Sequence, residues 1–509
     1  MRKIAKLLFH RVAIIAAFLV LQILLYASLL IWFNDYVFHL DWILRVLSAL
    51  VVLALINDRS NPGYKLGWIL IILITPIAGG FLYLLLGGNR LSYRNQRKLK
   101  AMEEKIRKHL NSDCVRSEML GELISPDAGH MACYLENAAG CPVYGNTETK
   151  YYRLGDDCFP DMLDALESAE KYIFLEYFII DQGEFWDAIF DVLSRKAAAG
   201  VDVRVIYDDI GSIFTVPSSF SAKLEHAGIN CRVFNRLVPV LSLRQNNRDH
   251  RKYLIVDGKV AFTGGLNLAD EYINRKVRFG HWKDSAIRLT GDAVWSITVS
   301  FLAMWGFTEG ANENYSDFRA LPAPQTENGY VQPYWDCPWD EEAVGQTVYL
   351  NLINKAKRYV YMTTPYLVLD YATTIALKNA ARSGVDVRII TPHIPDKKAV
   401  FELTRAHYEE LLDSGVRIFE YTPGFIHAKS FVADDTYGTV GTVNMDYRSM
   451  FLHFENGVLL YRTKTIEDLR YDFLQTQAVS EEVTKEWCRR VSWIRRFFRG
   501  ILKVFAPLL

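Results

Sequence analysis

The sequence predicts an α/β protein in which two similar halves, each a β-sheet flanked by helices, follow an N-terminal region of apolar helices. Helical and strand-like spacing of apolar residues alternates from about residue 130 onward, an order typical of sheets covered by helices. The pattern then repeats, because Gly-Val-Asp-Val-Arg at residues 200–204 recurs at residues 384–388 after a second alanine-rich segment. We therefore expect a tandem duplication over residues 130–320 and 325–480, joined by a Pro- and Gly-containing linker at residues 321–338.

The spacing also places individual elements in the first half. Apolar residues at helical spacing predict helices over residues 159–171 and 185–199. Runs rich in β-branched and aromatic residues predict strands over residues 172–180 and 201–207. From this alternating order of helices and strands we infer a sheet flanked by helices.

The first 90 residues contain three apolar stretches and form the predicted membrane anchor, residues 1–90. Residues 12–33 carry no charge and are long enough to span a bilayer, residues 42–56 are short, and residues 66–86 are interrupted by proline and glycine. Basic residues flank the region at both ends, which favours an even number of crossings and a cytoplasmic catalytic region. We therefore expect two or three hydrophobic helices in a multi-pass cell-membrane protein, with one stretch re-entrant or interfacial. A catalytic region on the outer face stays open as the alternative.

Two further segments are strongly basic. Residues 91–129 are expected to form a basic juxtamembrane linker. Residues 485–509 are expected to form an amphipathic helix that can lie among lipid headgroups. Its alternative is a helix packed on the soluble part with a solvated basic face. The apolar side of this predicted helix consists of Trp487, Val491, Ile494, Phe498, Leu502 and Phe505.

The composition and the short motifs argue against a metal or cofactor but indicate no particular partner. The chain has 509 residues, half of them hydrophobic, and a formal net charge of zero, so its overall charge indicates no particular partner. Its seven cysteines are scattered without a Cys-x-x-Cys pair, which argues against a disulfide framework and a zinc site. We find no HExxH and no Walker A loop either, and we expect no metal and no cofactor.

One motif occurs once in each predicted half. His250, Lys252 and Asp257 read HxKxxxxD, and His427, Lys429 and Asp434 read the same. Each histidine is followed fourteen residues later by a glycine and seventeen residues later by an asparagine. The positions concerned are Gly264, Asn267, Gly441 and Asn444. Two copies with five matching positions, one in each half of a duplication, make a chance match a poor explanation.

The spacing of the motif suits phosphodiester chemistry. A histidine and a lysine two residues apart on a strand point to the same face, so two packed halves can bring both pairs to one cleft. Two ammonium groups neutralise the non-bridging oxygens of a phosphodiester, and Asn267 and Asn444 can donate further hydrogen bonds to those oxygens. One neutral imidazole can attack phosphorus, and the other can protonate the leaving oxygen. The sequence therefore predicts transfer through a phosphohistidine, without saying which histidine is the nucleophile.

At these residues the chain resembles the phospholipase D superfamily, whose signature is the paired HxKxxxxD motif, and more closely the bacterial cardiolipin synthases. The resemblance extends over nearly the whole chain. It includes the motifs at residues 61–68, 175–178, 264–267, 441–449 and 506–509. It implies tandem phospholipase D-like domains with two mixed β-sheets related by a pseudo-twofold axis, behind an N-terminal transmembrane helical region.

The resemblance also implies a reaction and a set of roles. Two phosphatidylglycerol molecules would give cardiolipin and glycerol, with His250 as the nucleophile and His427 as general acid and then base. A carboxylate on a later strand orients each imidazole, a position that Asp284 fits in the first half and Glu455 in the second. Asp257 and Asp434 complete the motif and are counted with the catalytic set, with hydrogen bonds inside their own turns as their expected contribution. His453 departs from the polar amide residue that the family often has before Phe-Glu.

Three other functions remain open at this point. A lipid hydrolase would use the same chemistry with water as the acceptor. A nuclease would need a basic soluble face with aromatic stacking groups, whereas the basic runs here lie beside apolar segments and favour anionic lipid. A non-enzymatic membrane scaffold would not need two intact motifs. The expected partners are therefore phosphatidylglycerol and the membrane, without nucleic acid, and the oligomeric state is left open.

Overall fold

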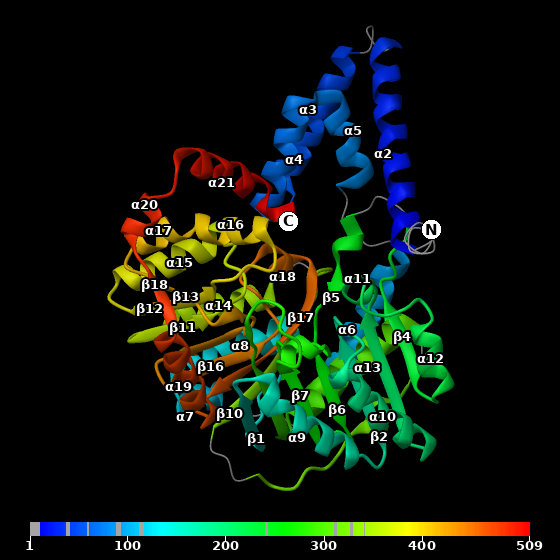
Figure 1. The fold of residues 1–509 in the computed structure, drawn as a ribbon, viewed down its shortest axis with the longest axis vertical. Helices are drawn as coiled ribbons and strands as arrows, with labels where there is room; N and C mark the ends of the chain where they lie inside the picture. The colour runs from blue at the N-terminus through cyan, green and yellow to red at the C-terminus, as the bar shows by residue number, and fades with distance from the viewer. Residues whose placement is uncertain are drawn as a thin grey trace.

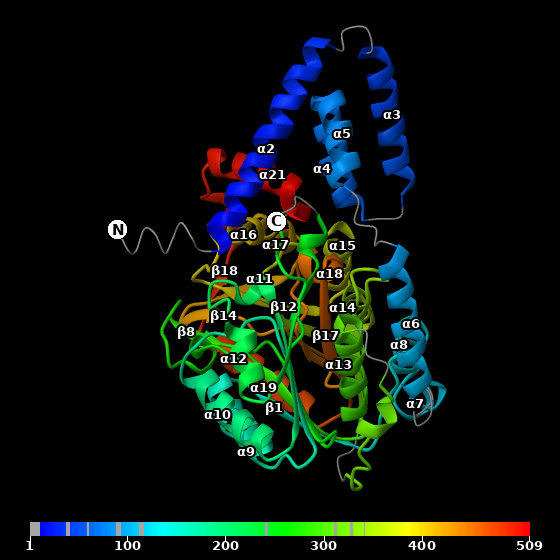
Figure 2. The same cartoon turned by 90° about the vertical axis from the view of Figure 1, so that its right-hand side faces the viewer.

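The computed structural model describes residues 11–36, 41–58, 61–87, 93–110, 117–239, 243–309, 313–325, 329–340 and 342–508. Two β-sheets flanked by helices make up the body of the molecule, and the helices of the N-terminal region stand together at one end of it (Figures 1 and 2). The predicted α/β class with two similar halves is confirmed.

The first sheet has seven strands and mixes parallel and antiparallel pairs. Its order is β1-β9-β7-β6-β2-β3-β4, with β2, β3 and β4 parallel to one another and the other neighbours antiparallel. The strands are β1 (Thr147–Tyr152), β2 (Tyr172–Tyr177), β3 (Asp202–Asp208), β4 (Asn230–Phe234), β6 (Tyr253–Val256), β7 (Val260–Gly264) and β9 (Ala286–Gly291).

The second sheet repeats this order strand for strand. It runs β10-β17-β16-β15-β11-β12-β13 and adds β18 at one edge. The strands are β10 (Tyr330–Asp336), β11 (Tyr359–Thr363), β12 (Asp386–Pro392), β13 (Arg417–Tyr421), β15 (Ser430–Ala433), β16 (Tyr437–Gly441), β17 (His453–Tyr461) and β18 (Ser480–Val483). The identical order explains the repeat in the sequence, since residues 200–204 lead into β3 and residues 384–388 into the equivalent β12.

Helices cover the sheets where the sequence pattern predicts them. The predicted helices over residues 159–171 and 185–199 are α9 (Gly155–Glu167) and α10 (Glu184–Ala198). The other helices of the two halves are α11 (Asp209–Ser212), α12 (Phe220–His226), α13 (Val294–Glu309), α14 (Val344–Lys355), α15 (Tyr371–Arg382), α16 (Lys398–Ala406), α17 (Tyr408–Asp413), α18 (Tyr447–Phe451) and α19 (Thr465–Ala478).

Segments that the sequence suggests as linkers contribute regular structure. Within the expected linker at residues 321–338, β10 forms an edge strand that pairs with β17 along its whole length. Residues 91–129 contain α6 (Tyr93–Leu110), α7 (Ser117–Leu123) and the start of α8 (Pro126–Ala139). Helix α6 packs on α13 of the first half, whereas α8 packs on α14 and β10 of the second, so this segment braces both halves.

The two halves also share strands and a core. The short strand β5 (Arg248–Asp249) of the first half pairs in parallel with β17 of the second. Likewise β8 (His281–Lys283) of the first half pairs in parallel with β14 (Gly424–Ile426) of the second. One buried apolar cluster contains Ile255 and Ile287 from the first sheet together with Val440 and Val458 from the second. Burial of this shared apolar surface holds the halves in a fixed relation.

The described residues of the N-terminal region form four helices. They are α2 (Arg11–Tyr36), α3 (Asp41–Asn57), α4 (Pro62–Ile74) and α5 (Pro76–Leu86). The chain reverses between α4 and α5, so that the two helices pack against each other. Their approach is close: a Cβ on Gly79 of α5 would lie 2.7 Å from the Cα of Ile72 of α4. The apolar stretch at residues 66–86 is thus divided at Pro76, as its sequence suggests. In the part of the chain that the structure describes, no helix combines the length and the apolar character that a membrane crossing needs, so the predicted crossings are not confirmed.

The C-terminal segment divides into shorter pieces than predicted. Residues 485–509 contain α20 (Lys485–Arg489), α21 (Trp493–Phe505) and a 3₁₀ turn η4 (Ala506–Leu508), rather than one helix. Ser492 begins α21 as its N-cap, and its hydroxyl accepts a hydrogen bond from the Arg495 N–H at 3.4 Å. The break at residues 490–492 lets α21 take its own direction on the surface.

Candidate active site

The two HxKxxxxD motifs lie on equivalent segments that lead into β6 and β15. His250 and His427 are 6% and 7% exposed, and Lys252 and Lys429 are fully buried beside them. The Lys252 Nζ donates a hydrogen bond to the His250 carbonyl at 2.5 Å, and the Lys429 Nζ donates to the His427 carbonyl. Each lysine therefore reaches back to its own histidine, although the two residues stand just before a strand rather than on it, and in the second half the Lys429 Nζ also lies 2.8 Å from the His427 Nδ1.

Each imidazole is held by a carboxylate from the other half of the molecule. The His250 Nδ1 donates to Glu455 at 2.9 Å from Oε2 and 3.0 Å from Oε1. The His427 Nδ1 donates to the Oδ2 of Asp284 at 2.6 Å. Both predicted carboxylates therefore contact imidazoles, but the partners are exchanged between the halves, which their positions in the sequence do not indicate. Because each Nδ1 is engaged, the atom of each ring that can meet a substrate is Nε2.

The exchange of carboxylates follows from the two strand pairings that join the halves. The His250 N–H donates to the Phe454 carbonyl at 2.9 Å, next to the β5–β17 pairing. The His427 N–H donates to the Lys283 carbonyl at 2.7 Å, next to the β8–β14 pairing. Each histidine is thus placed by its backbone one residue from the carboxylate that its ring contacts, and the two arrangements are equivalent under the internal symmetry.

Further groups hold the carboxylates in place. Glu455 accepts a hydrogen bond from the Thr442 hydroxyl. The Oδ1 of Asp284 accepts one from the Ser285 N–H at 2.8 Å. A Cβ on Gly265 would lie 1.9 Å from the same Oδ1, so only glycine leaves room for this carboxylate. The glycine in this turn is therefore needed to place Asp284.

The charges of both motifs act on the same imidazoles. Burial lowers the pKa of His250 well below its usual range, and Lys252 and Lys429 lower it further. The pKa of His427 is likewise lowered well below its usual range by burial, and again by Lys429 and Lys252. Each imidazole thus responds to the lysine of the other half, which agrees with the prediction that the four side chains share one site. Both rings are therefore neutral at neutral pH in the free enzyme.

Three other buried groups titrate near neutrality. Burial lowers the pKa of Lys252 to about 7 and that of Lys429 to about 8, although Glu455 and Asp284 raise both. Burial raises the pKa of Asp284 to about 7, although Lys429 lowers it. In the free enzyme the two lysines therefore carry less positive charge near neutral pH than two exposed lysines would. A bound anion would favour the charged ammonium forms.

Asp257 and Asp434 do not face this site. Each adopts a positive φ, 52° and 55°, at the turn that follows its motif strand. The Asp257 carboxylate accepts hydrogen bonds from the N–H groups of Glu170, Lys171 and Tyr172. The Asp434 carboxylate accepts them from the N–H groups of Lys357, Arg358 and Tyr359. They cap the segments that enter β2 and β11, so the expected hydrogen bonds inside their own turns are wrong, whereas their place in the catalytic set stays a prediction.

The two asparagines differ in their contacts. Asn267 is buried, its Oδ1 accepts a hydrogen bond from the Ile179 N–H at 3.0 Å, and its Nδ2 donates to the Tyr272 hydroxyl at 2.7 Å. Its amide is thus used to join two loops of the first half. Asn444 is also buried, but its Oδ1 has no hydrogen-bond partner among the described residues. Of the two side-chain amides, that of Asn444 makes fewer hydrogen bonds to the described residues.

His453 contributes a third imidazole at the site. It lies two residues before Glu455 on β17, so both face the same side, and its ring centroid lies 5.5 Å from that of His250. Neither of its ring nitrogens has a hydrogen-bond partner among the described residues, and burial lowers its pKa to about 3. Donor atoms of His250, His453 and Glu455 lie within 4.8 Å of one another, a set that could hold a metal ion. The nearby Lys252 ammonium opposes a cation there.

The motif does not reveal several neighbours of the site. Lys397, just before α16, lowers the pKa of both motif histidines, so a further cation lies near them. Phe178 packs edge-on against His250 at 5.0 Å between ring centroids, and Trp282 lies 5.6 Å from His427. Phe178 ends the Leu-Glu-Tyr-Phe motif at residues 175–178, which is the one sequence signal that points to it. No spacing or motif singles out Lys397.

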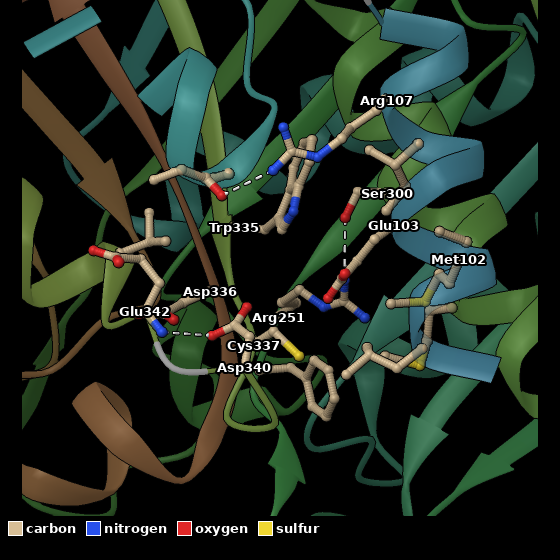
Figure 3. Close-up of a pocket in the computed structure, with 18 residues that line it drawn as sticks. Met102, Glu103, Arg107, Arg251, Ser300, Trp335, Asp336, Cys337, Asp340 and Glu342 are labelled. Atoms are coloured by element: carbon tan, nitrogen blue, oxygen red, sulfur yellow. Dashed lines mark hydrogen bonds between the residues drawn. The ribbon is translucent and has the colours of Figure 1, made fainter. Parts of the chain in front are cut away.

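A separate cavity lies behind the motif strand. It is lined by α6, α13 and β10, and Arg251, the residue between His250 and Lys252 in the chain, points into it (Figure 3). The Arg251 guanidinium pairs with Asp249 at 3.0 Å and with Glu176 at 2.5 Å. These ion pairs of Arg251 help to hold the first motif segment in place from the side of the cavity.

Comparison with known proteins identifies the family. The family described as cardiolipin synthase, PLD-like domain, matches residues 162–280 and 349–476, and the family described as phospholipase D-nuclease N-terminal matches residues 46–88. An uncharacterised protein of Streptococcus mutans is 42% identical, over 90% of this chain and 99% of its own length. A cardiolipin synthase of Halalkalibacterium halodurans is 32% identical, over 93% of this chain and 95% of its own length.

Among solved structures, a phosphatidylserine synthase of Haemophilus influenzae has the same fold. Its TM-score is 0.55 at 14% sequence identity, over 74% of this chain and 98% of its own. The two matches to the PLD-like domain fall one in each sheet, so the tandem arrangement of two such domains is confirmed.

Removal of the Asp257 or Asp434 carboxylate should lower stability without removing the chemistry. Asp257→Ala and Asp434→Ala each leave three backbone N–H groups without an acceptor, at a cost on the order of 1–3 kcal/mol. We expect a lower thermal unfolding midpoint for purified protein in detergent, with turnover per folded molecule retained. Asp257→Asn, which keeps one acceptor oxygen, should lose less. Abolished turnover in a fully folded variant would instead support a catalytic role for these residues.

Proposed function

The chain belongs to the cardiolipin synthase family of phospholipase D-like proteins, and from this membership we propose that it transfers a phosphatidyl group from one phosphatidylglycerol to another. The products are cardiolipin and glycerol, and the intermediate is a phosphohistidine. The observation that carries the proposal is the pair of exchanged imidazole–carboxylate contacts around two buried ammonium groups. Such a site offers a nucleophile, an acid and two countercharges for one phosphodiester.

In the proposed first step, the Nε2 of His250 attacks the phosphorus of the donor lipid. The N–P bond forms, the bond from phosphorus to the glycerol headgroup breaks, and His427 protonates the departing oxygen. Lys252 and Lys429 neutralise the non-bridging oxygens, on which negative charge grows. Glu455 stabilises the positive charge that develops on His250, as the carboxylate of a catalytic triad does for its histidine.

His427 needs a proton for this step, although burial and the two lysines keep it neutral in the free enzyme. Its Nδ1 shares a 2.6 Å hydrogen bond with Asp284, whose pKa burial raises to about 7, so the pair can hold a proton near neutrality. A bound phosphodiester adds negative charge beside the ring and favours its protonated form. The pair is thus prepared for acid catalysis by the substrate itself.

In the proposed second step, the headgroup hydroxyl of a second phosphatidylglycerol attacks the phosphohistidine. His427 accepts the hydroxyl proton, the N–P bond breaks, and His250 returns to its neutral form. Two lipid phosphodiesters now share one glycerol, which is cardiolipin. The same step with water would give phosphatidic acid, so the identity of the product separates transferase from hydrolase.

We further propose that the N-terminal region anchors the protein in the cell membrane as a multi-pass segment, with the catalytic halves on the cytoplasmic side. The match of residues 46–88 to the phospholipase D-nuclease N-terminal family and the basic residues on both sides of the region support this. The reversal at Pro76 supports a re-entrant third apolar stretch, which reconciles three apolar stretches with an even number of crossings.

Loss of either motif imidazole should nearly abolish turnover. In vesicles of phosphatidylglycerol, the wild-type protein should form cardiolipin and glycerol, identified by mass, and His250→Ala and His427→Ala should lower the rate by at least about a thousandfold, because each ring serves both steps. Asp434→Ala serves as the matched control, since it also alters a motif residue. Phosphatidic acid as the main product would replace the transferase by a hydrolase, and full activity in either histidine variant would remove the mechanism.

The pH dependence should reflect the lysines. For the free enzyme, kcat/KM should fall as pH rises through about 7 to about 8, because Lys252 and Lys429 lose the protons that bind the phosphodiester. The alkaline limb of kcat should lie at higher pH, since bound phosphate raises both pKa values. Initial rates with a short-chain soluble phosphatidylglycerol test this. A kcat/KM that is constant up to pH ~9 would contradict the lowered pKa values of the two lysines.

A further inference from the structure

Helix α21 packs on the second half through its charged face. Arg495 and Arg499 both donate from Nε to the Oε2 of Glu402 on α16, at 3.0 Å and 2.9 Å. Arg499 is buried in this contact, and Arg496 lies 3.8 Å from Glu409 of α17. The arginines thus attach this helix to the protein, together with Leu502, which packs against the apolar cluster that contains Leu403 of α16.

The apolar face of the same helix points away from the protein. Its exposure ranges from 76% at Trp493 to 37% at Phe505. The other exposed apolar residues of the helix are Ile494, Phe497, Phe498, Ile501 and Val504. An amphipathic helix on a soluble domain normally buries the apolar face and exposes the charged one. The sequence left two alternatives for this helix: contact with lipid headgroups, or packing on the soluble part with the basic face in solvent. The exposed apolar face excludes the second alternative.

The position of α21 relates this apolar face to the N-terminal helices. The turn η4 that follows it packs against the start of α4, where the Cγ of Pro507 lies 2.9 Å from the place of a Cβ on Gly63. In both views, α21 lies on the end of the body from which α2 to α5 project, and Figure 1 shows its C-terminal end beside the foot of α4. Helix α4 exposes apolar side chains as well, among them Leu66, Leu73 and Ile74.

We propose that α21 is an interfacial helix that lies in the surface of an anionic phospholipid bilayer, with its apolar face among the acyl chains and its inner face fixed to α16 by Glu402. Trp and Phe at this density suit the boundary between headgroups and acyl chains. The exposed cations Arg489 and Arg490, just before the helix, lie where anionic headgroups would meet them. The occupant of the face is thus a lipid surface, and the inference rests on the proposed function only in taking bilayer lipid as the substrate.

The contacts of α21 connect this lipid contact to the active site. Helix α16, which carries Glu402, begins directly after Lys397, the additional cation near both motif histidines. The turn η4 also contacts α18, which follows the loop of Asn444. Seating of α21 in the bilayer therefore fixes the height of the catalytic site above the lipid surface, so that a headgroup can reach it while the acyl chains stay in the membrane.

A substitution pair on the exposed face tests this. We expect Phe497→Ser/Ile501→Ser to lower kcat/KM for phosphatidylglycerol in vesicles by about tenfold or more. Activity on a soluble short-chain phosphatidylglycerol, which needs no surface, should be unchanged. Tyr471→Ser on α19 is the matched control, because it removes an exposed aromatic side chain from the far end of the second half (Figure 1) and should alter neither rate.

A second measurement does not depend on turnover. A fluorescent label at Phe498→Cys, in full-length protein reconstituted into vesicles with anionic lipid, should be quenched by lipids that carry a quencher on the acyl chain, whereas a label at Tyr471→Cys should not. An unquenched label at position 498, or an equal loss of both activities in the serine pair, would overturn the proposal. A change of oligomeric state in the serine pair would also overturn it, because a second copy of the chain would then cover the face. Failure of the wild-type protein on both lipid forms would overturn the proposed function instead and leave the quenching result to decide on α21.

Discussion

The hydrogen bond between each motif imidazole and a carboxylate of the other half is the contact on which the active site depends. His250 is oriented by Glu455, and His427 by Asp284. Neither half can complete its own histidine, so the duplicated fold has to pair with itself before it can act. The strand pairings β5–β17 and β8–β14 and the shared apolar core supply that pairing. Fold and chemistry are therefore linked through the interface between the halves.

The same interface buries several ionisable groups whose protonation a bound substrate would change. Two imidazoles and two ammonium groups lie buried with two carboxylates, and burial shifts the pKa of each motif lysine toward neutrality. A phosphodiester brings one negative charge and oxygen acceptors to this site, which favours the charged lysines and a protonated His427. Substrate binding thus prepares the acid that the first step requires. A neutral ligand of the same size would not do so.

Much of the fold and part of the site can be predicted from the sequence. The repeat at residues 200–204 and 384–388 gives the tandem halves, and the spacing of His250 and Lys252 indicates their contact. The exchange of Asp284 and Glu455 cannot be predicted, because one sequence does not reveal which strands pair between the two halves. The structural role of Asp257 and the outward apolar face of α21 are equally hidden, since both depend on contacts with segments distant in the sequence. Local patterns report periodicity and residue type, whereas these features follow from tertiary packing.

The most direct test of the exchanged contacts uses a phosphatidyl donor with a p-nitrophenol leaving group, which departs without a proton. Bond cleavage then needs the nucleophile and its carboxylate but not the acid. With His250 as nucleophile, the burst of nitrophenolate should persist in Asp284→Asn and be lost in Glu455→Gln, and mass analysis after an alkaline quench should find the phosphatidyl group on His250. A burst lost in Asp284→Asn and kept in Glu455→Gln, with the label still on His250, would contradict the exchange of carboxylates between the halves.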